Sequence, residues 1–224
     1  MTTMAGQRER ARQAYIADIT AEARRQLARD GAAGLSLRSV ARELGMVSSA
    51  VYRYVASRDE LLTLLIVEAY GDLADAVEAA IGGDDDGRVH WRSACASVRA
   101  WAVAHPHEYA LLYGSPVPGY SAPQDTIGPA TRLYAALVEP VRHRRGRRRP
   151  STVTSPVLEA DAERVAAALG FDVGAPVLLA ALGAIASLFG LVSFELFGHT
   201  NNVITDHDAF FALRVEALAD ELGL

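Results

Sequence analysis

Apolar residues recur at steps of three and four positions along most of the chain, which is the spacing of amphipathic helices. At the N-terminal end this spacing predicts a first helix over residues 8–29, a short second helix over 37–44 and a third short helical segment over 48–55. The third segment is too short to be stable unless it packs against its neighbours. A long fourth helix is expected to begin at residues 57–60 and to end at Gly82 and Gly83.

The remainder of the chain continues in the same pattern. Helical stripes are predicted over 88–105, 106–113, 130–141, 158–169, 176–197 and 208–222. Residues 114–129 are rich in Gly, Pro and Ser and are expected to be irregular, and the acidic run 84–86 is a candidate boundary between two bundles. Alternation typical of strands is absent from the sequence. The pattern therefore predicts an all-α protein.

Composition narrows the class of protein. The 224 residues are 50% hydrophobic, which is enough for a sizeable core, and a lone cysteine, Cys95, cannot form an internal disulfide. Together with the lack of a secretory leader pattern, this favours the cytoplasm. The net charge is -5, yet residues 1–60 hold ten Arg against seven Asp and Glu. The N-terminal part is thus the end that a polyanion would prefer.

The two short segments have the layout of a helix-turn-helix, in which the second helix enters the major groove of DNA. Serine hydroxyls, an alanine methyl, tyrosines and arginines can contact base edges or phosphates. Each of these side chains alone could equally be an ordinary core or surface residue. The candidate DNA-binding residues are Ser36, Arg38, Ser48, Ser49, Ala50, Tyr52, Arg53, Tyr54 and Arg58.

The stretches 36–45, 51–55 and 57–62 resemble the head of the TetR family of bacterial regulators, and the resemblance covers about the first seventy residues. It implies that Ser36 caps the second helix, that Arg38 touches bases or phosphate, that 48–50 and 52–54 form the reading surface, and that Arg58 holds a phosphate. Two positions depart from the usual pattern. Val47 stands where a Ser or Thr often caps the recognition helix, and Val55 where a Phe is common.

Residues 105–114 and 188–199 are similar to one actinobacterial type of TetR ligand-binding domain, in which Phe189 replaces an expected histidine. The resemblance implies a homodimer joined through the last two helices, with an effector cavity in each body. The expected organisation is a DNA-binding domain over 1–57, a connecting helix over 58–83, and a ligand-binding and dimerisation domain over 84–224. The candidate dimer residues are Gly183, Ser187, Gly190, Phe194, Phe211, Val215 and Leu218.

An apolar and aromatic face of the helix 88–105 is the candidate lining of the effector cavity, although a fully packed core would give the same pattern. The candidate ligand-binding residues are Trp91, Cys95, Val98, Trp101, His105 and Tyr109. A small-residue ridge that includes Gly183, Ser187 and Gly190 permits close helix packing, but it does not distinguish a dimer seam from a crowded core.

Several other classes of function are disfavoured. No nucleophile elbow, phosphate-binding loop or dinucleotide fingerprint appears, so neither an enzyme nor a cofactor is expected. His105 and His107 lack further metal ligands nearby in the sequence, and the uncharged run 177–194 is interpreted as a core helix rather than a membrane span. The basic run 142–149 is interpreted as a solvated loop. The expected partners are a double-stranded palindromic operator, a small-molecule effector and a second copy of the chain. The alternative is a helical small-molecule-binding or scaffold protein without operator binding.

Overall fold

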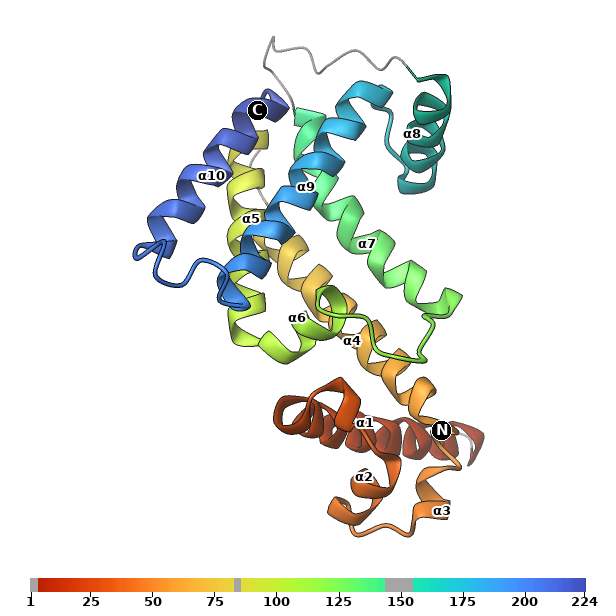
Figure 1. The fold of residues 1–224 in the computed structure, drawn as a ribbon. Helices are drawn as coiled ribbons and strands as arrows, with labels where there is room; N and C mark the ends of the chain where they lie inside the picture. The colour runs from red at the N-terminus through yellow and green to blue at the C-terminus, as the bar shows by residue number, and fades with distance from the viewer. Residues whose placement is uncertain (1–3, 83–85, 144–154) are drawn as a thin grey trace. The chain divides into compact units, whose positions relative to one another are not determined.

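The computed structural model describes residues 4–82, 86–143 and 155–224, and within these ranges the chain is helical, without a strand. This confirms the predicted all-α fold (Figure 1). The α-helices are α1 Met4–Asp30, α2 Leu37–Glu43, α3 Ser48–Val51, α4 Arg58–Ala80, α5 Gly87–Ala104, α6 Pro106–Tyr113, α7 Ile127–Val138, α8 Pro156–Leu169, α9 Ala175–Leu196 and α10 His207–Leu222.

Most predicted boundaries lie within four residues of those observed, and two of the differences have a clear physical reason. Helix α7 begins at Ile127, three residues before the predicted start at Ala130, because Pro129 lies in the first turn of the helix. A first-turn proline loses no hydrogen bond, since the N–H groups there have no partner within the helix. Helix α3 is shorter than the predicted 48–55, because residues Tyr52 to Tyr54 continue it only as a turn.

The chain forms two compact units, which we describe separately. One unit comprises Met1–Ala69 with His107–Ile127, and the other comprises Tyr70–Pro106 with Gly128–Leu224. The boundary between the two compact units thus falls inside helix α4, between Ala69 and Tyr70. The functional boundaries predicted from the sequence lie instead after residues 57 and 83. The assignment of functions to those three segments stays a prediction.

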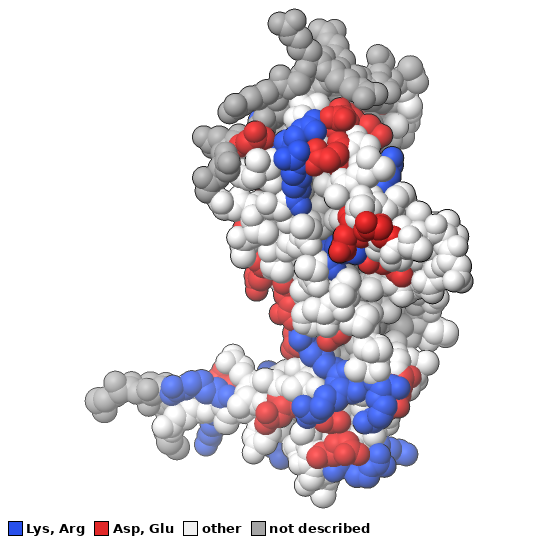
Figure 2. Space-filling model, turned by 90° about the vertical axis from the view of Figure 1, so that its left-hand side faces the viewer, with Lys and Arg blue, Asp and Glu red and all other residues white. Residues whose placement is uncertain are grey.

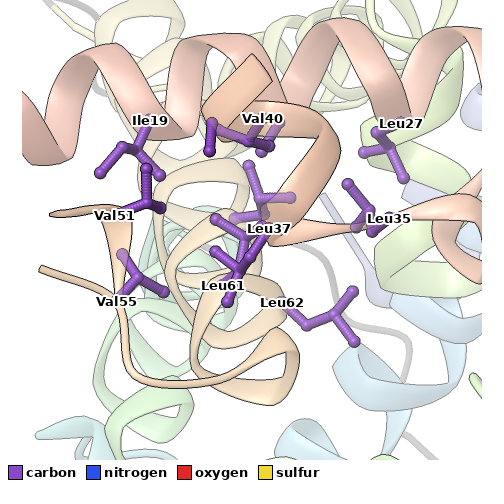
Figure 3. Close-up of a cluster of buried hydrophobic side chains, with 12 residues drawn as sticks. Ile19, Leu27, Leu35, Leu37, Val40, Val51, Val55, Leu61 and Leu62 are labelled. Carbon is purple, nitrogen blue, oxygen red and sulfur yellow. The ribbon is translucent and has the colours of Figure 1, made fainter. Parts of the chain in front are cut away.

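The first unit is built around one buried apolar cluster, which joins α1, α2, α3 and the start of α4 (Figure 3). Helices α1 and α4 supply long aliphatic side chains from either side, and the short helices contribute β-branched residues between them. The labelled members are Ile19, Leu27, Leu35, Leu37, Val40, Val51, Val55, Leu61 and Leu62. All nine are at most 3% exposed, so the stripes predicted for these helices are core faces.

The loop before α2 is fixed by Arg58, the first residue of α4. Its Nε donates a hydrogen bond to the carbonyl oxygen of Leu35 at 3.2 Å, and its Nη2 donates to that of Ala32 at 2.8 Å. The start of α4 is capped by Ser57, whose hydroxyl accepts from the N–H of Glu60 at 3.0 Å. The guanidinium of Arg58 therefore ties two segments of the first unit together.

The second unit is organised around α5, which packs against both α9 and α10. The indole N–H of Trp91 donates to the carbonyl oxygen of Val215 at 3.1 Å, and both groups are buried. At the start of α5, Asp86 accepts from the N–H of Arg88 at 2.8 Å, so the last residue of the acidic run 84–86 serves as an N-cap, while 84 and 85 lie outside the described residues.

Arginines on the exposed side of α5 connect it to α10. Arg88 forms ion pairs with Glu216 and Asp220, and its Nη2 also donates to the carbonyl oxygen of Leu224 at 2.8 Å. Hydrogen bonds from Arg92 and then from Arg88 lower the pKa of the Glu216 carboxyl below its usual value. The last helix is thereby held along its length against α5.

Helix α9 is long and apolar enough to cross a membrane by length and composition, with a mean hydropathy of 2.3 over its most apolar window. The core helix of a folded domain passes the same test. In the second unit α9 packs against α8, α10 and α5, and it buries Leu178, Ile185 and Leu188 almost completely.

The two hydrogen bonds of Arg58 generate a prediction about stability. Arg58→Ala should lower the free energy of unfolding by about 1 to 3 kcal/mol, because hydrogen bonds from a charged donor to partly buried acceptors are lost. Arg38→Ala is the matched control, since Arg38 is exposed and has no hydrogen-bond or ion-pair partner among the described residues. It should change stability by less than about 0.5 kcal/mol. Urea denaturation followed by circular dichroism measures both, and equal effects would refute the structural role of Arg58.

Candidate DNA-reading surface

The turn between α2 and α3 sets the direction in which α3 leaves the core. Gly45 adopts φ +66°, in the left-handed region that favours glycine, and its N–H donates to the carbonyl oxygen of Arg42 at 3.1 Å. The N–H of Met46 then donates to the carbonyl oxygen of Ala41 at 2.8 Å. These bonds close the end of α2 and reverse the chain within a few residues. The arrangement is that of a helix-turn-helix.

Helix α3 is held in place by its buried face. Val51 and Val55 are both 0% exposed, and the N–H of Val55 donates to the carbonyl oxygen of Val51 at 3.0 Å. The helical rise therefore extends one turn beyond the last α-helical residue. A segment this short has no stability of its own, so packing of these two valines fixes its orientation.

Polar side chains cover the opposite face of α3. Ser49, Tyr52 and Arg53 are exposed, with Tyr52 43% exposed, while Ser48 and Ala50 are half-buried. Tyr52 and Arg53 have no hydrogen-bond or ion-pair partner among the described residues. These five predicted residues thus share one short segment, and the larger side chains are available to bases or phosphates.

Tyr54 has a different position from the other predicted reading residues. It is half-buried against the apolar cluster, and its ring centroid lies 5.0 Å from that of Tyr15 on α1. Contact between the two rings stabilises the end of α3 against α1. Its predicted place in the reading surface is consequently limited to the exposed edge of the ring.

Of the predicted contact residues outside α3, some side chains have hydrogen-bond partners within the fold and others have none among the described residues. Arg38 on α2 is exposed and has no partner among the described residues, whereas two donors of Arg58 are held by backbone carbonyl groups. Ser36 occupies the N-cap position of α2, but its hydroxyl makes no capping bond. Its N–H instead donates to the side-chain oxygen of Gln26 at 3.2 Å. Arg38 is therefore the better candidate for a DNA contact than Arg58.

Val47 lies next to the candidate DNA-reading surface, although it was not among the predicted contact residues. It is the N-cap residue of α3, without a side-chain capping bond, and it is 71% exposed. Its methyl groups have the chemistry that contacts the C5-methyl group of thymine. The signal was present in the sequence, because an apolar residue stands where a polar cap is expected.

Most of the predicted effector face is buried inside the second unit. Trp91, Cys95 and Val98 are 0% exposed, and burial raises the pKa of the Cys95 thiol well above its ordinary value. Trp101 is 7% exposed and stacks on His105, with ring centroids 5.0 Å apart. This burial favours the packed-core alternative, and half-buried His105 is the least buried member of the face on α5.

The sixth predicted ligand-binding residue, Tyr109, lies on α6 in the first unit. It is 0% exposed, and its ring centroid is 5.1 Å from that of Tyr113. It is thus a core side chain of the unit that also contains the helix-turn-helix.

The predicted dimer residues fall into two groups. Gly183, Ser187 and Phe194 on α9 are exposed and Gly190 is half-buried, so this ridge lies on the surface of the unit. The three residues predicted on α10 are instead part of the unit's own core: Phe211, Val215 and Leu218 are 8%, 4% and 1% exposed. These three side chains pack within the unit, with Phe211 also lining the groove between α9 and α10, and their place in a dimer seam stays a prediction.

A groove runs between α9 and α10 on the exposed side, with a volume of about 320 Å³. Phe194, Phe210 and Leu191 make its walls largely apolar, and Arg214 contributes a guanidinium group that has no partner among the described residues. Glu195, which also lines the groove, pairs with Arg99 of α5 at 2.7 Å. Part of the accessible apolar surface of these helices therefore lies along one groove.

Among the described residues, no group of three or more His, Cys, Asp or Glu side chains could hold a metal ion. Of the basic run 142–149, only Arg142 has a described side chain, and it lies over the ring of Phe171 at 5.0 Å. The rest of the run lies outside the described residues.

Family comparisons agree with this geometry. Residues 19–65 match the family described as bacterial regulatory proteins, tetR family, and residues 91–218 match a Tetracyclin repressor-like C-terminal domain. The chain is 43% identical over 231 residues to proteins named HTH-type transcriptional regulator in Mycobacterium tuberculosis and Mycobacterium bovis, with 99% of this chain and 98% of each relative covered. These relatives are named as regulators, in agreement with the expectation that the chain is not an enzyme.

Solved structures show the same fold. One regulatory protein is 32% identical, with a TM-score of 0.78 and coverage of 95% of this chain and 98% of that one. The TetR-family regulator PfmR of Thermus thermophilus, at 17% identity, has a TM-score of 0.56 over 88% of this chain and 97% of its own, which shows the shared fold. A helix-turn-helix with an exposed reading face and close relatives along the full length lead to one conclusion: the chain belongs to the TetR family of bacterial transcriptional regulators.

Proposed function

We propose that this regulator is a cytoplasmic repressor that binds a palindromic operator as a homodimer and is released by a small hydrophobic ligand. The observation that carries DNA reading is the exposed face of α3, where Tyr52 and Arg53 have no partner among the described residues. Arg38 on α2 adds a third free side chain. A pair of such heads would read two half-sites related by twofold symmetry.

The homodimer is supported by the exposed side of α9 and α10. Phe194, Phe197 and Leu213 are 56%, 41% and 66% exposed, and Phe194 also lines the groove between the two helices. At Gly183 and Gly190 a Cβ atom would meet nothing within 4 Å, so this side of α9 is open to a second helix. A symmetric four-helix seam would cover these surfaces.

The ligand is proposed to occupy the second unit near the end of α5. Trp101 and His105 offer a stacked aromatic pair, and the Nδ1 atom of His105 lies 3.0 Å from the carbonyl oxygen of Trp101. An apolar ligand with one polar atom suits such a lining. Among structures that share the fold, a TetR from Acinetobacter baumannii, at 16% identity and a TM-score of 0.52 over 92% of this chain and 96% of that one, is described in complex with minocycline.

Release requires that the ligand prefer one of two dimer states. Helix α4 begins next to the reading surface at Arg58 and continues to Ala80, so it is the natural element to transmit a change. Half-sites about 34 Å apart tolerate little change in the spacing of the two heads.

The first prediction of this subsection concerns DNA reading. Arg38→Ala and Tyr52→Ala should each weaken binding to the duplex that the wild-type protein selects from random-sequence DNA by about 1 to 3 kcal/mol, because each removes a free contact group. Fluorescence anisotropy measures the change. Tyr15→Phe serves as a control, since it retains the ring that packs on Tyr54. Wild-type affinity in a variant that carries both Arg38→Ala and Tyr52→Ala would show that α3 is not the reading helix and would favour a scaffold without operator binding.

The second prediction concerns the dimer. Phe194→Arg combined with Gly190→Arg should give a monomer, because two charges would be buried in the apolar seam without partners. Light scattering at micromolar concentration measures the mass. Val157→Arg on α8, at a residue that is 72% exposed, is the matched control and should remain dimeric. A wild-type monomer under the same conditions contradicts the proposal.

The third prediction concerns the ligand. Trp101→Ala should still bind DNA but should be released at a changed effector concentration. The reason is that the variant removes the indole ring that stacks on His105 and is proposed to line the ligand site. The effector is to be found by screening small molecules for release of the selected duplex. Loss of DNA binding together with thermal stability, without a change in effector response once the variant is stabilised, would instead make Trp101 a core residue.

A further inference from the structure

We infer that the N-terminal part of α1 is a second DNA-contacting element, in which Arg8 and Arg12 bind phosphates of the duplex beyond the end of the recognition helix. This inference rests on the proposed binding of DNA by the helix-turn-helix and adds a second contact zone to it. The segment concerned is residues 6–14, named here the arm.

The arm contributes nothing to the core of the first unit. Residues 7–14 are all exposed, and the first fully buried residue of α1 is Ile19. Figure 2 shows basic side chains on this projecting part of the first unit. The arm sequence, Gly-Gln-Arg-Glu-Arg-Ala-Arg-Gln-Ala, has no apolar stripe. A helix that is polar all round is not explained by packing within its own domain.

Contact between Tyr15 and Tyr54 fixes the direction of one face of the arm. The two ring centroids are 5.0 Å apart, so the side of α1 that carries Tyr15 turns toward the end of the recognition segment. Arg12 precedes Tyr15 by three residues and Arg8 by seven, and these spacings place all three side chains on one helical face. Arg10 lies on roughly the opposite face, about 200° around the helix from Arg8.

The guanidinium groups of the two arginines on this face are also available to bind an anion. Neither Arg8 nor Arg12 has a hydrogen-bond or ion-pair partner among the described residues. The acid within the arm, Glu9, accepts a hydrogen bond from the side chain of Gln13 at 3.3 Å. Arg10, by contrast, donates from its Nε to the carbonyl oxygen of Gly6 at 3.2 Å.

Distance and charge together identify the partner as a phosphate backbone. Arg8 lies about 10 Å along the helix axis from Tyr15, at 1.5 Å per residue, which is close to the major-groove width of about 12 Å. A recognition helix seated in the groove would therefore bring the arm to phosphates beyond the end of that helix, in the DNA that flanks the half-site. Guanidinium groups bind phosphate oxygens strongly and without regard to sequence.

The experiment compares salt dependence in matched variants. The probe is the duplex that the wild-type protein selects from random-sequence DNA, with one additional helical turn on each side of the half-sites. For the double variant Arg8→Ala with Arg12→Ala, the slope of log affinity against log salt should become shallower by about two per protomer. Affinity at about 0.1 M salt should fall several-fold per contact, with unchanged sequence preference. Arg10→Ala is the control and should keep the wild-type slope.

Two additions separate a phosphate contact from a structural effect. The double variant Arg8→Lys with Arg12→Lys should recover most of the slope, because the charge is retained. On a duplex that ends at the half-sites, the wild-type protein and the double alanine variant should bind equally, because the flanking phosphates are gone. Thermal melting should be the same for the double alanine variant and for Arg10→Ala, since all three residues lie outside the core.

Each of three results would overturn the inference: a slope of the double alanine variant equal to that of Arg10→Ala, a loss of affinity that persists on the short duplex, or a change in sequence preference. If the wild-type protein selects no duplex at all, the proposed function fails and the arm fails with it. Failure of the arm alone leaves wild-type selection intact, so the two outcomes are distinguishable.

Discussion

The reading surface depends on the packing of two valines. Val51 and Val55 are the buried anchors of a helix that is α-helical over only four residues, Ser48–Val51. Such a segment pays the full cost of helix nucleation and gains almost nothing from propagation. Its geometry is therefore set by the apolar cluster beneath it, to which α1, α2 and α4 all contribute (Figure 3). Any change that loosens this cluster would alter the orientation of α3 without touching a residue on its exposed face.

The chain contains no lysine, so every Lys or Arg position is an arginine. The arginines differ in whether their guanidinium groups have partners within the fold. Arg58 and Arg99 each connect segments distant in the sequence, the first through backbone carbonyl groups and the second through Glu195 and Asp208. Arg38 and Arg53 remain exposed and without partners among the described residues. A guanidinium already satisfied within the fold must give up those bonds before it can bind phosphate. Availability thus separates the arginines that connect segments of the fold from those proposed to contact DNA.

Periodicity predicted the helices well but could not say what each apolar face packs against. The stripe over 106–113 coincides with α6, and the short helices around Gly45 lie where the pattern put them. The stripe of Phe211, Val215 and Leu218 was likewise real, and it is buried within the second unit, where Trp91 of α5 donates to the carbonyl oxygen of Val215. A period of 3.6 marks an apolar face and carries no information about which neighbour covers it. Hydrogen bonds between distant segments, such as those of Arg58, leave no trace in the sequence pattern either.

Helix α9 shows why this ambiguity matters for assembly. It is apolar over nearly its whole circumference, and only 39% of its most apolar window is buried within the second unit. Helices that are apolar on every side are normally covered on every side. The hydroxyl of Ser187 donates to the carbonyl oxygen of Gly183 at 3.0 Å, so burial of this polar group would not leave its hydrogen unpaired. The open side of α9 thus combines small residues, satisfied polar groups and adjacent aromatic side chains. These are the properties that a helix needs when a second helix is to approach it closely.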